Sequence, residues 1–153
     1  EDKVAGHIRA EVPTLVSAPL EQGFFEVGSW IRFSGKPARV LEALWSYEPK
    51  PSTGPEDPHH SVLTDEGRHD RLQSYGLREL RKRISQGYVM PQGEKRALTE
   101  TLSARVAGER NLDLALEIFQ LLSVFREKGA IQTALAQYPA RDRELIQGVL
   151  SRQ

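Results

Sequence analysis

The stretch RHDRLQSYGLRELRKRIS, residues 68–85, combines the apolar spacing of a helix with a concentration of positive charge. Leu77, Leu80 and Ile84 fall on one helical face, so the stretch is predicted to form an amphipathic helix. The whole chain is neutral, with 21 basic and 21 acidic residues. Positive charge concentrated on one helix of a neutral protein indicates an anionic partner. The stretch holds two acidic residues and six basic ones: Arg68, Arg71, Arg78, Arg81, Lys82 and Arg83.

The residues before this helix carry the opposite charge. Residues 42–67 hold six acids and one base, and the prolines within residues 48–60 indicate a loop. Thr64 precedes two acidic residues that suit the first turn of a helix, so Thr64 is the expected N-cap. The sign of the charge therefore changes at Arg68.

The N-terminal part of the chain contains short runs that favour β-strands. Apolar and polar residues alternate over residues 7–12, which predicts a half-buried strand. The runs at residues 24–27 and 30–33 flank Gly28-Ser29 and are predicted to form a tight hairpin. Gly87–Met90 is a further β-prone run. We expect these runs to build a small N-terminal antiparallel sheet.

The remaining segments show helical spacing. A helix over residues 37–45 is expected to begin with Pro37 in its first turn. Residues 94–107 place apolar side chains at every fourth position, and Gly108 is expected to end that helix. Two short helices are predicted beyond residue 130. The predicted fold class is α+β but mostly α, with the sheet and helices of residues 1–91 followed by a helical extension or dimerisation region at 92–153.

The segment Leu112–Phe125 is apolar on nearly every side, so a helix there must be covered all round. One interpretation makes it the central helix of a C-terminal helical bundle. The other makes it a dimerisation helix that a second copy of the chain covers. The sequence leaves both open.

Three segments resemble winged-helix DNA-binding domains of the response-regulator type. They are IRFSGKPARVLEALW (residues 31–45), LRELRKRI (residues 77–84) and GYVM (residues 87–90). The resemblance covers roughly residues 24–91 and implies a winged-helix-like core in which the basic helix meets DNA.

The leading functional hypothesis is that the chain binds double-stranded DNA as a transcription or replication regulator. Arginine and lysine on an exposed helix can contact phosphates, and arginine can also read guanine edges. Arg78, Arg81, Lys82 and Arg83 are the expected contacts, with Arg68, Arg71 and Lys36 in support. The alternative is a protein–protein adaptor or a subunit of a larger assembly that does not bind nucleic acid.

Other functions find little support in the sequence. The absence of cysteine excludes thiolate zinc sites and cysteine nucleophiles, and His59-His60 lacks the spacing that aims two rings at one metal ion. No phosphate-binding or nucleotide-binding motif appears, so we expect no enzyme activity, no cofactor and no metal. The apolar stretches are too short and too charged to cross a bilayer, and no leader peptide is visible, so a cytoplasmic protein is expected.

Overall fold

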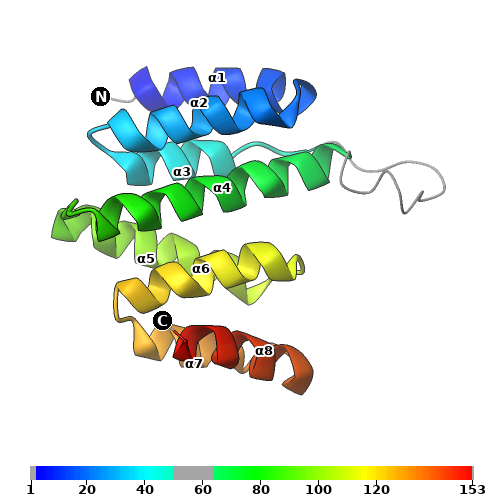
Figure 1. Ribbon diagram of the computed structural model, residues 1–153, viewed down its shortest axis with the longest axis vertical. Helices are drawn as coiled ribbons and strands as arrows, with labels where there is room; N and C mark the ends of the chain where they lie inside the picture. The colour runs from blue at the N-terminus through cyan, green and yellow to red at the C-terminus, as the bar shows by residue number, and fades with distance from the viewer. Residues whose placement is uncertain (1–2, 50–63, 153) are drawn as a thin grey trace. The chain divides into compact units, whose positions relative to one another are not determined.

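The computed structural model describes residues 3–49 and 64–152, which form eight α-helices and no strand (Figure 1). The predicted α+β class, with its antiparallel sheet and winged-helix-like core, is therefore wrong. The chain divides into two compact units, Glu1–Arg83 and Ile84–Gln153, where the sequence suggested a division after residue 91. The helices are α1 (Lys3–Ser17), α2 (Leu20–Phe33), α3 (Pro37–Trp45), α4 (Asp65–Ser85), α5 (Gln92–Ala107), α6 (Leu112–Val124), α7 (Lys128–Leu135) and α8 (Ala140–Ser151).

The first predicted strand, residues 7–12, lies inside α1. Ile8 and Val12 are fully buried, as a strand would also require, but the pattern continues through Leu15 and Val16. These four positions follow the i, i+4, i+7, i+8 spacing of a helix. Pro13 lies within the helix rather than ending it.

The predicted hairpin is also helical, because residues 24–33 all belong to α2. Gly23, Val27 and Ile31 are buried at i, i+4 and i+8, which is the spacing of one helix face. Gly28 does not form a turn. A Cβ on Gly28 would lie 3.2 Å from the Tyr75 ring, so its missing side chain allows α4 to approach.

The third predicted strand, Gly87–Met90, follows α4 as a turn and an irregular segment without strand pairing. Gly87 has a φ of +114°, in a region that favours glycine, and the turn separates α4 from α5. The predicted wing of a DNA-binding domain is thus absent from the described residues.

The first unit contains α1 to α4. Helix α1 packs on α2 and α3, and α2 packs on α3. Helix α4 packs along α2 and α3, since the position of Gly76 on α4 faces Val27, Leu41 and Leu44. Helices α2 and α4 run in the same direction (Figure 1). The predicted Thr64 N-cap is confirmed, because its Oγ1 accepts a hydrogen bond of 3.0 Å from the Gly67 amide.

In the second unit, α5 packs on α6 and α7, and α6 packs on α7 and α8. The predicted helix over residues 94–107 is confirmed, with Gly108 as its C-cap. Helix α6 buries Leu114, Ile118, Phe119 and Leu122 within this unit. Its apolar character is explained by the neighbouring helices, as the bundle interpretation of Leu112–Phe125 expects, and a second copy is not needed to cover it.

Candidate interaction surface

Helix α4 turns a row of basic side chains away from its buried side. Arg71, Arg78 and Lys82 are exposed at i, i+7 and i+11, which places them on one stripe of the helix. The opposite side buries Leu77 and Leu80. The amphipathic helix expected from the sequence is therefore present, and three of its cations share one exposed stripe.

Two other predicted contacts, Arg68 and Arg83, donate hydrogen bonds to main-chain carbonyl groups. Arg68 Nη1 lies 2.8 Å from the Ala18 oxygen, immediately before α2. Arg83 Nη1 lies 2.9 Å from the Ile31 oxygen and 2.7 Å from the Ser34 oxygen, at the other end of α2. These arginines thus attach α4 to both ends of α2.

The last two predicted contacts lie apart from this stripe. Arg81 is half-buried on the flank of α4, and Lys36 is exposed at the N-cap of α3. The Lys36 amide donates to Ser34 Oγ over 3.0 Å, within the turn that joins α2 to α3. The structure brings Arg71, Arg78 and Lys82 together but does not add Arg81 or Lys36 to their stripe.

Helix α2 carries two exposed aromatic side chains. Phe25 is 69% exposed and Phe33 is 80% exposed. The Arg32 guanidinium lies 5.9 Å from the centre of the Phe33 ring, and the Phe24 and Tyr75 rings are 4.8 Å apart across the two helices. Sequence reasoning missed Phe25 and Phe33 because it placed them on opposite strands of a hairpin.

An ion pair joins α2 to α4. Arg32 Nη1 lies 3.0 Å from Glu79 Oε1, and the Glu79 side chain is only 8% exposed. A nearly buried carboxylate needs such a cation, since leaving it unpaired would be costly. Arg32 is therefore held against α4, close to Phe33. We call these exposed side chains of α2 and α4 the α2–α4 face: Phe25, Arg32, Phe33, Arg71, Arg78 and Lys82.

A cluster of polar side chains at the start of α4 links this helix to α3 and to the residues after α3. The buried His69 donates from Nε2 to the Leu44 oxygen over 2.7 Å, because a carbonyl can only accept. Gln73 Nε2 lies 3.3 Å from His69 Nδ1. The Tyr47 hydroxyl donates to Asp65, and burial together with that carboxylate raises the pKa of Tyr47 to about 12. Such satisfied groups indicate a structural role.

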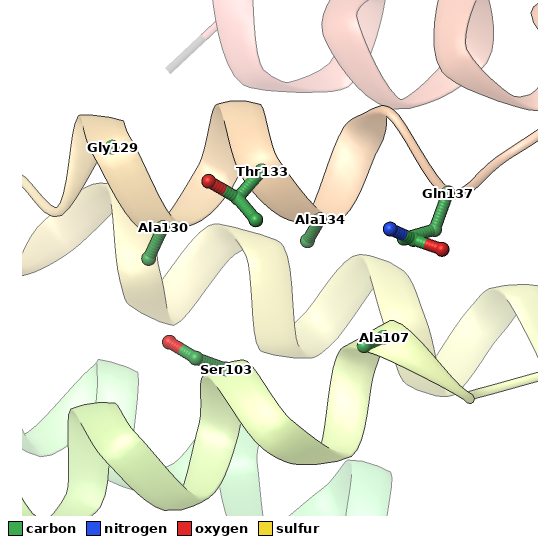
Figure 2. Close-up of a pocket in the computed structure, with 7 residues that line it drawn as sticks. All are labelled: Ser103, Ala107, Gly129, Ala130, Thr133, Ala134 and Gln137. Atoms are coloured by element: carbon green, nitrogen blue, oxygen red, sulfur yellow. The ribbon is translucent and has the colours of Figure 1, made fainter.

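A shallow pocket of about 230 Å³ lies between α5 and α7 in the second unit (Figure 2). Its lining residues are small or uncharged, so it offers hydrogen bonds but neither charge nor acid–base chemistry. It lacks the convergent reactive groups of an active site. The lining consists of Ser103, Ala107, Gly129, Ala130, Thr133, Ala134 and Gln137.

Neither a cluster of metal-ligating side chains nor a membrane-spanning helix occurs in the described parts of the chain. Residues 3–49 and 64–152 contain no group of three or more histidine, aspartate or glutamate side chains that could hold a metal ion. His59 and His60 lie outside the described residues. Within the same ranges, no helix has both the length and the apolar character that crossing a bilayer requires.

Comparison of the chain with protein-family models, with curated proteins and with solved structures returns no match. The α2–α4 face must therefore be interpreted from its own chemistry.

Proposed function

We propose that the chain is a protein-interaction module, acting as an adaptor or a subunit of a larger assembly, and that it binds its partner through the α2–α4 face. The observation that carries this proposal is the exposure of Phe25 and Phe33 on α2, with the exposed Arg32 guanidinium 5.9 Å from the centre of the Phe33 ring. Aromatic residues and arginine are the side chains enriched in the cores of protein interfaces.

The energetic reason is the cost of leaving large rings in water. Burying a phenylalanine side chain contributes about 1.5–3 kcal/mol. The rings of Phe25 and Phe33 are mostly unburied within the chain, so most of this contribution remains for a partner to supply. Arg32 is held near Phe33 by Glu79, so part of the surface is ordered before binding.

DNA binding is the second candidate, and the stripe of Arg71, Arg78 and Lys82 favours it. Those side chains could contact successive phosphates with a strong dependence on salt. Duplex phosphates would not bury Phe25 and Phe33, however. Arg68 and Arg83 also hold α2 in place, which makes them less suited to a nucleic-acid contact.

Site-specific photo-crosslinking tests the proposal. A benzophenone amino acid is introduced at position 25 or 33 of the full chain in its native cells. The matched control is position 89, because Val89 is 84% exposed and belongs to the second unit. We expect a discrete protein adduct from positions 25 and 33 and none from position 89. The adduct should be lost when Arg78→Glu and Lys82→Glu are added.

Two results would contradict the proposal. Nuclease-sensitive adducts from position 25 would assign the surface to nucleic acid. Equal crosslinking from positions 25 and 89 would mean that the α2–α4 face has no specific partner. Circular dichroism of each variant confirms that the helices remain folded.

A further inference from the structure

We infer that α2 binds α2 of a second copy of the chain, in an antiparallel pair whose two-fold axis passes beside Ser29. The inference rests on the proposed function, because it identifies the partner that Phe25 and Phe33 contact. In such a pair each copy contributes the same surface, so that surface must be complementary to itself.

The outward side of α2 is a row that contains every fourth residue. Phe25 and Phe33 are exposed in this row, and Ser29 lies halfway between them with its side chain half-buried. Val27 and Ile31 are buried and lie two residues from members of the row, so they face the opposite side of the helix. The row therefore points away from the core of the first unit.

Neighbouring helices border the outward row but leave it exposed. The centre of the Phe24 ring lies 4.8 Å from that of Tyr75 on α4, and the centre of the Trp30 ring lies 6.5 Å from that of His7 on α1. Phe24 and Trp30 lie about 100° to either side of the row. Contacts with α4 and α1 thus occupy the flanks of α2, and the row between them is open to a partner.

The spacing of the outward row suits a second copy of the same helix. Phe25 precedes Ser29 by four residues, and Phe33 follows it by four. When two copies of α2 cross antiparallel at Ser29, Phe25 of each copy meets Phe33 of the other. Rows of every fourth residue interdigitate in the commonest class of helix packing, with the axes about 50° apart. The small side chain of Ser29 at the crossing lets the two backbones approach closely.

The charges on α2 favour the antiparallel orientation over the parallel one. Glu21 and Glu26 lie in the first half of the helix, and Arg32 lies in its last turn. The Arg32 side chain is 42% exposed beside its ion pair with Glu79, so part of its guanidinium group remains at the surface. Antiparallel pairing brings the acidic half of each helix towards the end of the other that carries Arg32. Parallel pairing would bring like charges together.

The same carboxylates distinguish this surface from one that binds nucleic acid. Glu21 is exposed one turn before Phe25, and Glu26 is partly exposed next to it. Both would repel a phosphate backbone that crossed Phe25. A second copy of the chain has no net charge and meets no such repulsion.

The dimer should be weak and reversible. One helix from each copy forms it, so the buried area falls at the small end of specific interfaces, below about 1,200 Å². The phenylalanine rings supply most of the apolar contact, and paired aromatic rings stabilise each other beyond the area that they bury. We therefore expect a dissociation constant in the micromolar range.

Cysteine crosslinking tests the pairing, because the chain has no cysteine of its own. Ser29→Cys places one thiol of each copy beside the two-fold axis, within the roughly 7 Å between Cα atoms that a disulfide allows. Mild oxidation of this variant should give a covalent dimer. Gln22→Cys lies on the same side of α2 but should give little dimer, because its two copies are about 21 Å apart in the antiparallel pair.

The matched control for Ser29→Cys is Ser103→Cys, which changes a half-buried serine of the second unit. It should give no more covalent dimer than random collision produces. Circular dichroism of each cysteine variant checks that the helices remain folded.

Sedimentation equilibrium of the unmodified chain provides an independent measurement. It should show a monomer–dimer equilibrium, and Phe25→Ser/Phe33→Ser should raise the dissociation constant by about tenfold or more. Val89→Ser is the control, because Val89 is 84% exposed and belongs to the second unit. This substitution should change the dissociation constant by less than about twofold.

Four results would overturn the inference. The first is an unmodified chain that stays monomeric up to millimolar concentration. The second is Ser29→Cys that crosslinks no more than Ser103→Cys, and the third is Gln22→Cys that crosslinks as readily as Ser29→Cys. The fourth is a dissociation constant that Phe25→Ser/Phe33→Ser leaves unchanged.

The two proposals can fail separately. If photo-crosslinking from positions 25 and 33 gives an adduct with a different protein, the second copy is the wrong partner but the adaptor function stands. An adduct with the mass of two chains supports both proposals. If position 25 crosslinks no more than position 89, the proposed function itself is wrong.

Discussion

At the scale of single residues, Gly23 is a position where α2 lies close to a side chain of α4. A Cβ at this position would lie 2.7 Å from Leu72 Cδ2, and Leu72 is fully buried. We expect Gly23→Ala to lower the free energy of unfolding by about 1–3 kcal/mol because the core would be overpacked. Urea denaturation measures the change.

Gly148 provides the matched control for Gly23. It lies within α8, and a Cβ there would meet nothing within 4 Å. Gly148→Ala should raise the free energy of unfolding by about 0.5–1 kcal/mol through helix propensity alone. Equal effects of the two substitutions would contradict the packing account of Gly23.

The ion pair of Arg32 and Glu79 gives a second prediction at this scale. Arg32→Ala leaves a carboxylate that is 8% exposed without its cation, so unfolding should become easier by about 1–3 kcal/mol. Adding Glu79→Gln removes the buried charge and should restore part of the loss. A double variant no more stable than Arg32→Ala, in urea denaturation, would show that the charge of Glu79 is not the cause.

At the scale of elements, the end of α6 holds a side chain in an unfavourable conformation. Arg126 has a φ of +62°, which favours glycine. Its amide donates to the Ser123 oxygen, and the Glu127 amide donates to the Leu122 oxygen, which together form a Schellman motif. Arg126→Gly should therefore raise the melting temperature, with a gain of about 1 kcal/mol. An unchanged or lower melting temperature would contradict this account.

Tyr138 joins the end of α5 to the segment after α7. Its hydroxyl donates to the Val106 oxygen over 2.7 Å and to the Glu109 oxygen over 3.2 Å. Burial, followed by the charges of Glu109 and Asp142, raises the pKa of Tyr138 to about 12 from the ordinary value of 10.0. The neutral hydroxyl is the form that the fold favours.

This shift predicts that stability depends on pH in alkaline solution. A raised folded-state pKa gives a contribution that is complete below pH 10.0 and is lost as the pH rises towards about 12. Tyr138→Phe should cost about 1 kcal/mol near neutral pH and should make the alkaline decline shallower. Part of the alkaline loss of stability should remain in the Tyr138→Phe variant, because the pKa of Tyr47 is also raised to about 12. Midpoints of urea denaturation below and above pH 10.0 measure this pH dependence. An equally steep loss of stability in the Tyr138→Phe variant would contradict the prediction.

At the scale of the whole molecule, the sequence analysis predicted the long helices that have a clear helical period. It failed where a short apolar run fitted both the two-residue period of a strand and the 3.6-residue period of a helix. Leu98, Leu102 and Val106 recur at every fourth position with the charged Glu100 between the first two, so the run that ends at Gly108 indicates a helix and not an alternating strand. Ile8 and Val12 fit a strand and a helix equally, and Leu15 and Val16, which distinguish the two, follow a proline.

The sequence analysis predicted only part of the candidate surface. Charge clustering identified the basic stripe of α4, but it could not separate Arg78, which is exposed, from Arg83, which contacts distant carbonyl groups. Phe25 and Phe33 were missed because Gly28 was interpreted as a turn. The spacing of Gly23, Val27 and Ile31 was the available signal for a helix with an outward aromatic side.

The attachment of α2 by Arg68 and Arg83 has an evolutionary consequence. Both guanidinium groups donate hydrogen bonds to main-chain carbonyl oxygens, which every residue type possesses. These hydrogen bonds therefore do not depend on the side chains of Ala18, Ile31 or Ser34. Outward positions of α2 other than Arg32 can therefore mutate while the helix keeps its place. Descendants of this chain could acquire new specificities on an unchanged scaffold.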